Sequence, residues 1–175
     1  MKKILLILLL LVIVGVGTLF VINGKDSYDP SKYSATLSDG LKVGSTITYT
    51  LPDQFDKSYT LDDSIHTLIV VFAKESGHSV KNFLKEQTAD YLSQHKAAFI
   101  ADVSPMPVVI RNTFALPDLK KESYSVKLIY DKKIADAFKK YAQSSEDIAL
   151  VTLKNKKITG IKYVKTAQEI KETLK

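Results

Sequence analysis

Residues 67–95 read TLIVVFAKESGHSVKNFLKEQTADYLSQH, and this stretch decides the fold class. Its first part, residues 67–72, is a short run of mostly β-branched apolar residues, which is typical of a strand buried on both faces. The part that follows repeats apolar residues at helical spacing, at Val80, Phe83, Leu84, Tyr91 and Leu92. Ser76 is a residue type that favours the N-cap of such a helix. A buried strand followed by an amphipathic helix predicts the start of an α/β unit.

Strands and helices continue to alternate on both sides of this unit. Upstream, residues 46–51 and 58–61 flank the turn-rich PDQFDK and predict a β-hairpin. Downstream we expect strands at 97–103, 124–130, 148–153 and 158–164. Between them we expect a helix from Pro107 that stops or kinks near Pro117, and a short helix at 134–141. A last helix is opened by the capping box Thr166–Glu169. This order predicts an α/β layered fold with helices on both faces of a sheet.

The N-terminal segment differs from the rest of the chain. Lys2 and Lys3 precede residues 4–22, which carry no charge. A helix of that length spans about 28 Å, close to the thickness of a bilayer core. We expect an uncleaved transmembrane signal anchor that contacts the lipid bilayer through residues 4–22, with cleavage near Gly15 and Gly17 as the alternative. The two lysines predict a cytoplasmic N-terminus, so the body is expected in the periplasm or outside the cell.

Three regions follow from this division of the chain. Residues 1–22 form the predicted anchor, residues 23–40 are polar and predict a tether, and residues 41–175 form the predicted domain. The full chain of 175 residues is 45% hydrophobic and 25% charged, a composition typical of one folded domain. It contains no cysteine, which excludes disulfides and thiol chemistry by this chain.

The formal charge of +6 rests almost entirely on lysine, because Arg111 is the single arginine. Readers of nucleic acid favour arginine, so this bias argues against base-specific binding. No glycine-rich phosphate loop follows a predicted strand, so the sequence gives no basis for a nucleotide site. The three histidines, His66, His78 and His95, show no paired metal-ligand spacing. We therefore expect no nucleic acid, nucleotide, metal or cofactor.

The order of elements resembles the thioredoxin-like superfamily, and most closely its peroxiredoxin-type and membrane-tethered branches. Four stretches carry the resemblance: TLPDQFDKSYTL (50–61), TLIVVFAKESGHS (67–79), YSVKLIYDKKIADAF (124–138) and the terminal β-β-α unit (148–174). The resemblance implies a thioredoxin-like three-layer α/β/α sandwich with an N-terminal β-hairpin, here preceded by one transmembrane helix.

The chain departs from that family where the family does its chemistry. Redox-active members carry two cysteines around a dipeptide at the start of the first long helix, and here that position reads Ser76, Gly77, His78 and Ser79. A serine hydroxyl has no accessible anion comparable to a thiolate, so thiol–disulfide exchange and cysteine-based peroxide reduction are excluded. The family's cis-proline position aligns with Ile148 and Ala149, without proline. Both departures indicate a degenerate, cysteine-free member.

Two groups of residues are candidate sites. Ser76, His78 and Ser79 are consistent with an ordinary helix cap, with binding of an anion or a partner's carboxylate, or with a hydrolase in which His78 is the base. The second group combines three prolines with an apolar surface and the single arginine. It comprises Pro105, Met106, Pro107, Arg111 and Phe114, with Pro117 as the third proline, and suits either a protein partner or a proline-bracketed helix with a solvated Arg111.

A cluster of acids, Asp53, Asp56, Asp62 and Asp63, lacks the spacing of a calcium loop and predicts turns and a solvated edge. Taken together, these features predict a membrane-anchored, outward-facing domain without redox activity that binds or scaffolds another envelope protein. Two alternatives remain. One is an enzyme, hydrolytic or dependent on a cofactor, that uses Ser76 or Ser79 with His78. The other is a carrier of a small molecule or lipid, which needs a large apolar pocket.

Overall fold

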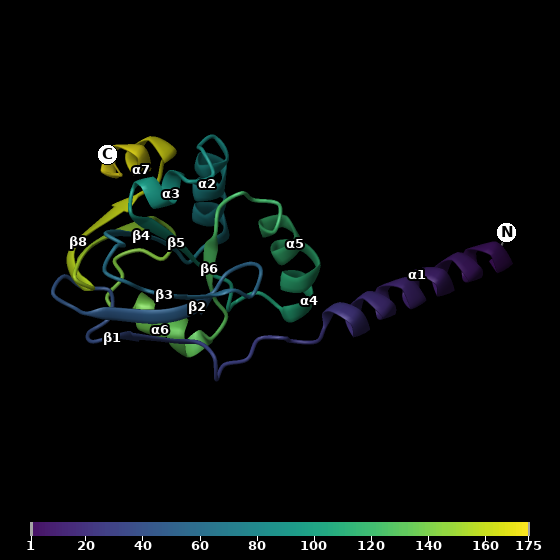
Figure 1. The fold of residues 1–175 in the computed structure, drawn as a ribbon. Coiled ribbons are helices and arrows are strands. Elements are labelled where there is room, and N and C mark those ends of the chain that lie inside the picture. The colour runs from purple at the N-terminus through teal and green to yellow at the C-terminus, as the bar shows by residue number, and fades with distance from the viewer. Residues whose placement is uncertain (1, 175) are drawn as a thin grey trace.

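The strands of this chain form two sheets, which Figure 1 shows together with the helices. The computed structural model describes residues 2–174, with side chains for residues 4–18, 21 and 23–174. The strands are β1 (Ser34–Leu37), β2 (Ile47–Pro52), β3 (Ser58–Thr60), β4 (Thr67–Val71), β5 (Ala97–Asp102), β6 (Val126–Ile129), β7 (Ile148–Lys154) and β8 (Lys157–Val164). The helices are α1 (Lys2–Asn23), α2 (Lys74–Lys85), α3 (Tyr91–Gln94), α4 (Val108–Ile110), the π-helical turn η1 (Arg111–Ala115), α5 (Leu116–Leu119), α6 (Lys132–Lys139) and α7 (Ala167–Thr173).

The larger sheet has the order β6-β5-β4-β7-β8. Strands β4, β5 and β6 are parallel, whereas β7 runs antiparallel to β4 and β8 antiparallel to β7. The central strand β4 is buried along nearly its whole length, which confirms the prediction of a strand covered on both faces. Because β4 and β5 are parallel, their carboxyl ends meet at one edge of the sheet, and α2 begins there.

Each face of this sheet is covered by a separate apolar layer. On one face α2 and α7 bury residues such as Phe83 and Ile170 against the strands. On the other face lie α6 and the three-stranded sheet β1-β2-β3, which bury Phe138 and Ile47. The predicted layered α/β fold with helices on both faces is therefore confirmed. The predicted hairpin is formed by β2 and β3, and β1 pairs with β2 as a third strand.

Three predicted helices have different bounds in the structure. The helix expected to continue to His95 ends at Lys85, and α3 follows after a break, because Thr88, Ala89 and Asp90 are exposed and give no apolar face to bury. The helix near Pro117 does not stop there but continues to Leu119. Pro117 is tolerated because it lies in the first turn of α5, directly after the π-helical turn. The helix predicted at residues 134–141 instead spans Lys132–Lys139 and is capped by Asp131. The predicted C-terminal capping box at Thr166 and Glu169 is confirmed.

Helix α1 extends away from the body (Figure 1). Its described apolar side chains from Ile4 to Val14 are each more than half exposed. Its carboxyl end lies against α4. No helix within the described residues combines the length and the apolar character that crossing a membrane requires.

Much of the segment expected to be a tether, residues 23–40, lies against the body. We call residues 23–33 the strap. The ring of Tyr28 stacks on Tyr130 with centroids 4.9 Å apart and on Tyr33 at 5.6 Å. The Tyr33 hydroxyl donates a 2.7 Å hydrogen bond to Asp56. Burial, followed by this hydrogen bond, raises the pKa of Tyr33 to about 12. After the strap, β1 pairs with β2.

Candidate functional site

Two adjoining hollows lie where β4 and β5 end and α2 begins. The inner cavity measures about 120 Å³, and its floor is apolar, formed by side chains such as Val71, Phe99 and Val103. The outer groove is wider, at about 590 Å³, and runs along the segment that carries α4 and η1. Both hollows are lined by Lys74, His78, Asp102, Met106, Ala115 and Asp118. This position, at the carboxyl ends of parallel strands, is where α/β folds commonly place a binding site.

The two serines of the predicted site use their hydroxyls within the helix. α2 begins at Lys74 with Ala73 as its N-cap, so the prediction of Ser76 as the N-cap is wrong. The chain passes from β4 into the helix with only two residues between them, which brings Ser76 into the first turn. There its buried hydroxyl donates to the Ala73 carbonyl at 3.1 Å. The Ser79 hydroxyl donates to the Glu75 carbonyl, also at 3.1 Å.

His78 lies exposed at the lip of both hollows. Among the residues that the structure describes, neither serine hydroxyl nor any carboxylate forms a hydrogen bond or ion pair with its ring. A Ser–His hydrolase needs the base in contact with the nucleophile and a third group that orients the base. The geometry therefore gives the hydrolytic alternative no support.

Gly77 lines the inner cavity at a position where a side chain fits. A Cβ there would meet Val71 Cγ2 at 3.8 Å, an ordinary contact. We expect Gly77→Ala to raise the free energy of unfolding by about 0.5–1 kcal/mol, because alanine restricts the unfolded chain and favours the helix. Denaturant unfolding of the full chain, followed by circular dichroism, measures this.

Gly40→Ala is the matched control for that substitution. Gly40 has a φ of +65°, and its Cβ would lie 2.5 Å from the Lys140 carbonyl oxygen, so this variant is expected to be destabilised. A loss of stability in both variants would contradict the account of Gly77.

Asp102 fixes one wall of the site, and the sequence reasoning did not single it out. Its side chain is fully buried, receives a 2.6 Å hydrogen bond from Lys139 of α6, and accepts the Ser104 backbone N–H at 2.9 Å. These bonds fix the turn that follows β5, where the outer groove begins. The available signal was its place at the end of a predicted strand, since acids at the carboxyl ends of parallel strands often face a site.

Lys81 closes the other side of the inner cavity. Its ammonium group pairs with Asp118 and lies 3.2 Å from a Glu122 oxygen, so it ties α2 to the end of α5. Burial opposes the charged form, but the hydrogen bonds to Asp118 and Glu122 prevail and raise the pKa of Lys81. Asp102 and Asp118 thus each have a lysine partner, whereas Lys74 and His78 stay exposed at the rim.

The second predicted group is divided by the structure. Pro105, Met106, Pro107 and Phe114 line the outer groove together. Arg111 does not join them. It is only 3% exposed, its Nη2 donates to Asp26 at 2.7 Å, and its guanidinium lies 4.6 Å from the centre of the Tyr130 ring. Arg111 is therefore neither a surface cation nor solvated, because the strap covers it.

The acidic residues serve turns, as predicted. Asp53 accepts the backbone N–H groups of Phe55 and Lys57, and Asp62 accepts that of Ser64. Asp53 is buried, however, so the prediction of a solvated edge is wrong for this residue. The described residues contain no group of three or more acids or histidines placed to hold a metal ion.

No protein-family model and no curated protein matches the chain. Solved structures do. The peroxidoxin BcpB from Mycobacterium tuberculosis is 14% identical, covers 77% of this chain and 94% of its own, and has a TM-score of 0.51. A peroxiredoxin-like protein from Aquifex aeolicus is 13% identical, covers 80% and 90% respectively, and has a TM-score of 0.50. The fold is thioredoxin-like.

This result confirms the resemblance seen in the sequence. It also allows the position of the hollows to be compared with the position that the resemblance gives to the family's thiols. In this cysteine-free thioredoxin-like chain, the residues at the start of the first long body helix are Ser76 to Ser79, and the inner cavity opens beside them. No cis peptide bond occurs among the described residues. The thioredoxin-like domain thus keeps an open apolar hollow at the place where the resemblance puts the family's thiols.

Proposed function

We propose that this chain is a membrane-anchored, outward-facing thioredoxin-like domain that binds another envelope protein and has no thiol redox activity. The observation that carries the proposal is the inner cavity. Its floor is apolar and it lies beside Gly77 and His78, whose neighbours in α2, Ser76 and Ser79, have hydroxyls that are already engaged within the helix. A site with this chemistry suits recognition of a side chain better than attack on a bond.

The proposed anchor is α1. Support comes from the absence of charge over residues 4–22, the preceding Lys2 and Lys3, and the exposed apolar side chains along the helix. Apolar side chains exposed along a whole helix need a non-aqueous surrounding, which a bilayer provides. With the lysines on the cytoplasmic side, the body faces the periplasm or the exterior.

The size and charge of the site favour a polypeptide segment as the partner. The inner cavity of about 120 Å³ suits one apolar side chain and lies below the range of about 300–1,000 Å³ that is common for small-molecule pockets, a range that, of the two hollows, only the wider outer groove of about 590 Å³ reaches. The adjoining outer groove gives such a segment a path along Met106 and Pro107. Lys74 and His78 at the rim offer donors to the partner's carbonyl or carboxylate groups.

A photo-activated crosslinking residue placed at Met106 of the full chain, in its native membranes, tests this proposal. We expect a discrete adduct with one envelope protein. The adduct should disappear when Ala115→Leu fills the inner cavity, because the partner side chain loses its place. A crosslinker at the exposed Phe55, in the β2–β3 turn, is the control and should not give this adduct.

Two results would contradict the proposed function. One is an adduct at Met106 that persists in the Ala115→Leu variant, or that appears equally from position 55. The other is turnover above background when the purified full chain is assayed for insulin reduction or peroxide consumption, since this would show redox activity without a thiol of its own.

A further inference from the structure

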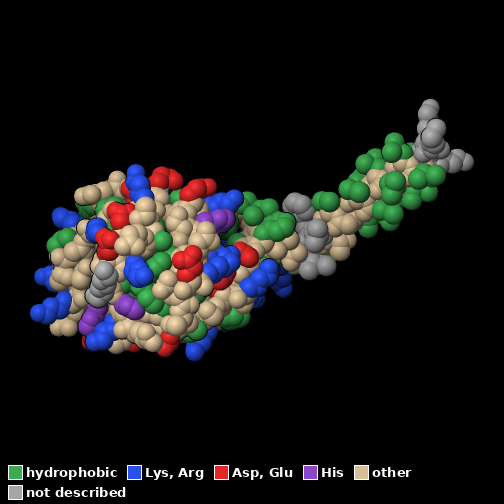
Figure 2. All heavy atoms as spheres, turned by 90° about the horizontal axis from the view of Figure 1, so that it is seen from above, with side chains coloured by type: hydrophobic (Ala, Val, Ile, Leu, Met, Phe, Trp, Pro, Cys, Tyr) green, Lys and Arg blue, Asp and Glu red, His purple; other side chains and the backbone are tan. Residues whose placement is uncertain are grey.

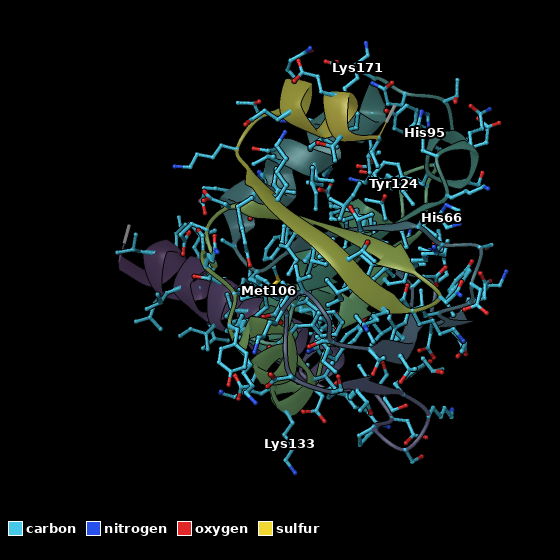
Figure 3. The ribbon with its side chains drawn as sticks, turned by 90° about the vertical axis from the view of Figure 1, so that its left-hand side faces the viewer. His66, His95, Met106, Tyr124, Lys133 and Lys171 are labelled. Atoms are coloured by element: carbon cyan, nitrogen blue, oxygen red, sulfur yellow. The ribbon has the colours of Figure 1, made fainter. Side chains whose placement is uncertain are left out.

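Two exposed apolar side chains of the body lie beside the end of α1. Ile110 is 46% exposed and Phe114 is 64% exposed. They are four residues apart on the continuous helical segment of α4 and η1, and therefore lie on nearly the same side of it. The other large apolar side chains that are described as exposed outside α1 are Val43, Phe55 and Tyr141, and these lie on other segments. Figure 2 shows hydrophobic side chains gathered on the body next to the base of α1.

The residues between Ile110 and Phe114 hold the chain where α1 ends. The Asn112 side-chain amide donates 3.0 Å hydrogen bonds to the carbonyls of Asn23, the last residue of α1, and of Lys25. Arg111 binds Asp26, one residue further along. These bonds fix the α4–η1 segment next to the carboxyl end of α1, so Ile110 and Phe114 lie close to the place where the helix meets the body.

The charges around this pair suit a lipid surface. Lys25 and Lys74 are exposed nearby, the first directly after α1 and the second lining the outer groove with Ile110 and Phe114. The acids of the same region already have cationic partners: Asp26 has Arg111, Asp102 has Lys139 and Asp118 has Lys81. Apolar side chains flanked by lysines are the pattern that binds the interface of an anionic membrane.

We propose that Ile110 and Phe114 insert into the headgroup–acyl boundary of the bilayer that holds α1, so that the body rests on the membrane with the α4–η1 edge toward the lipid. This inference rests on the proposed function in one respect, namely that α1 lies in a membrane. It adds a second lipid contact and a fixed orientation of the body.

Because the chain contains no tryptophan, one introduced tryptophan reports on one position. We would place it in the full chain as Phe114→Trp, as Phe55→Trp on the β2–β3 turn, and as Val14→Trp within α1. Each variant is reconstituted into vesicles of phosphatidylcholine and phosphatidylglycerol whose acyl chains carry bromine, a contact quencher. Far-ultraviolet circular dichroism confirms that each variant is folded.

We expect brominated lipid to reduce the emission of the Phe114→Trp and Val14→Trp variants by about half or more, since interfacial side chains reach roughly 5–10 Å into the headgroup region. The Phe55→Trp variant should be unaffected. Quenching at position 14 without quenching at position 114 would overturn the inference and leave the anchor intact. No quenching at position 14 would overturn the anchor itself. A blue-shifted but unquenched emission at position 114 would show a protein surface there and overturn the lipid contact.

Discussion

Replacing Phe138 with alanine is expected to lower the free energy of unfolding by about 3–5 kcal/mol, because it leaves a cavity in a fully buried position. Phe138 lies on α6 and is completely inaccessible to solvent. It belongs to the apolar cluster that joins Ile47 of the three-stranded sheet to Ile100 and Ile129 of the five-stranded sheet. Loss of its ring therefore weakens the contact between the two sheets as well as the attachment of α6.

The same chemical change at Phe114 is the matched control. Phe114 is 64% exposed, so Phe114→Ala is expected to change the free energy of unfolding by less than about 0.5 kcal/mol. Denaturant unfolding of the full chain in detergent, followed by circular dichroism and tyrosine fluorescence, measures both variants. Equal losses at the two positions would contradict the packing described for α6.

The sequence predicted several features that depend on local pattern, although it misplaced the start and end of α2. The apolar run at residues 67–72 became β4, the turn-rich residues 52–57 joined β2 and β3, and the capping box at Thr166 opened α7. Each of these depends on periodicity or on residue types within a few positions. The order of such elements resembled that of the thioredoxin-like superfamily, and this resemblance implied the fold that the structure has.

The strap was missed because its contacts are distant in the sequence. Tyr28 lies in a polar stretch with no periodicity, and its stacking partner Tyr130 directly follows β6. Asp26 and Arg111 are 85 positions apart, so nothing in their neighbourhoods indicated that they pair. The same applies to Asp102 and Lys139, which come together only when α6 packs against the sheet. Aromatic residues at Tyr28 and Tyr33 in a polar tether were the one available signal.

Replacing Arg111 with alanine is expected to lower the free energy of unfolding by about 2–3 kcal/mol. A hydrogen bond to a charged group contributes about 1.5–3 kcal/mol and a cation–π contact about 0.5–2 kcal/mol. Arg111 makes one of each, to Asp26 and to the Tyr130 ring. The lower part of the summed range applies because the Asp26 side chain is 45% exposed and is rehydrated when its partner is removed.

The loss should be concentrated in the strap. Without Arg111, residues 23–33 keep the tyrosine stack, the hydrogen bond from Tyr33 to Asp56 and the Asn112 hydrogen bonds. Trypsin should then cleave after Lys25 and Lys32 faster than in the parent chain, while the body stays folded by circular dichroism. Asp26→Asn is the milder control, because it removes the charge of the partner but leaves Arg111 stacked on Tyr130. It should cost about 1 kcal/mol.

Arg111→Ala also separates a structural role of the strap from its role in orienting the body. If Arg111 and Asn112 set the position of the α4–η1 edge relative to α1, then adding Arg111→Ala to the Phe114→Trp variant should reduce quenching by brominated lipid, while quenching in the Val14→Trp variant is unchanged. Unchanged quenching at both positions, together with faster cleavage of the strap, would show that Ile110 and Phe114 contact the lipid even when the strap is detached. The single arginine of the chain, which the sequence left open as a partner contact or a solvated side chain, would then stabilise the strap without orienting the body.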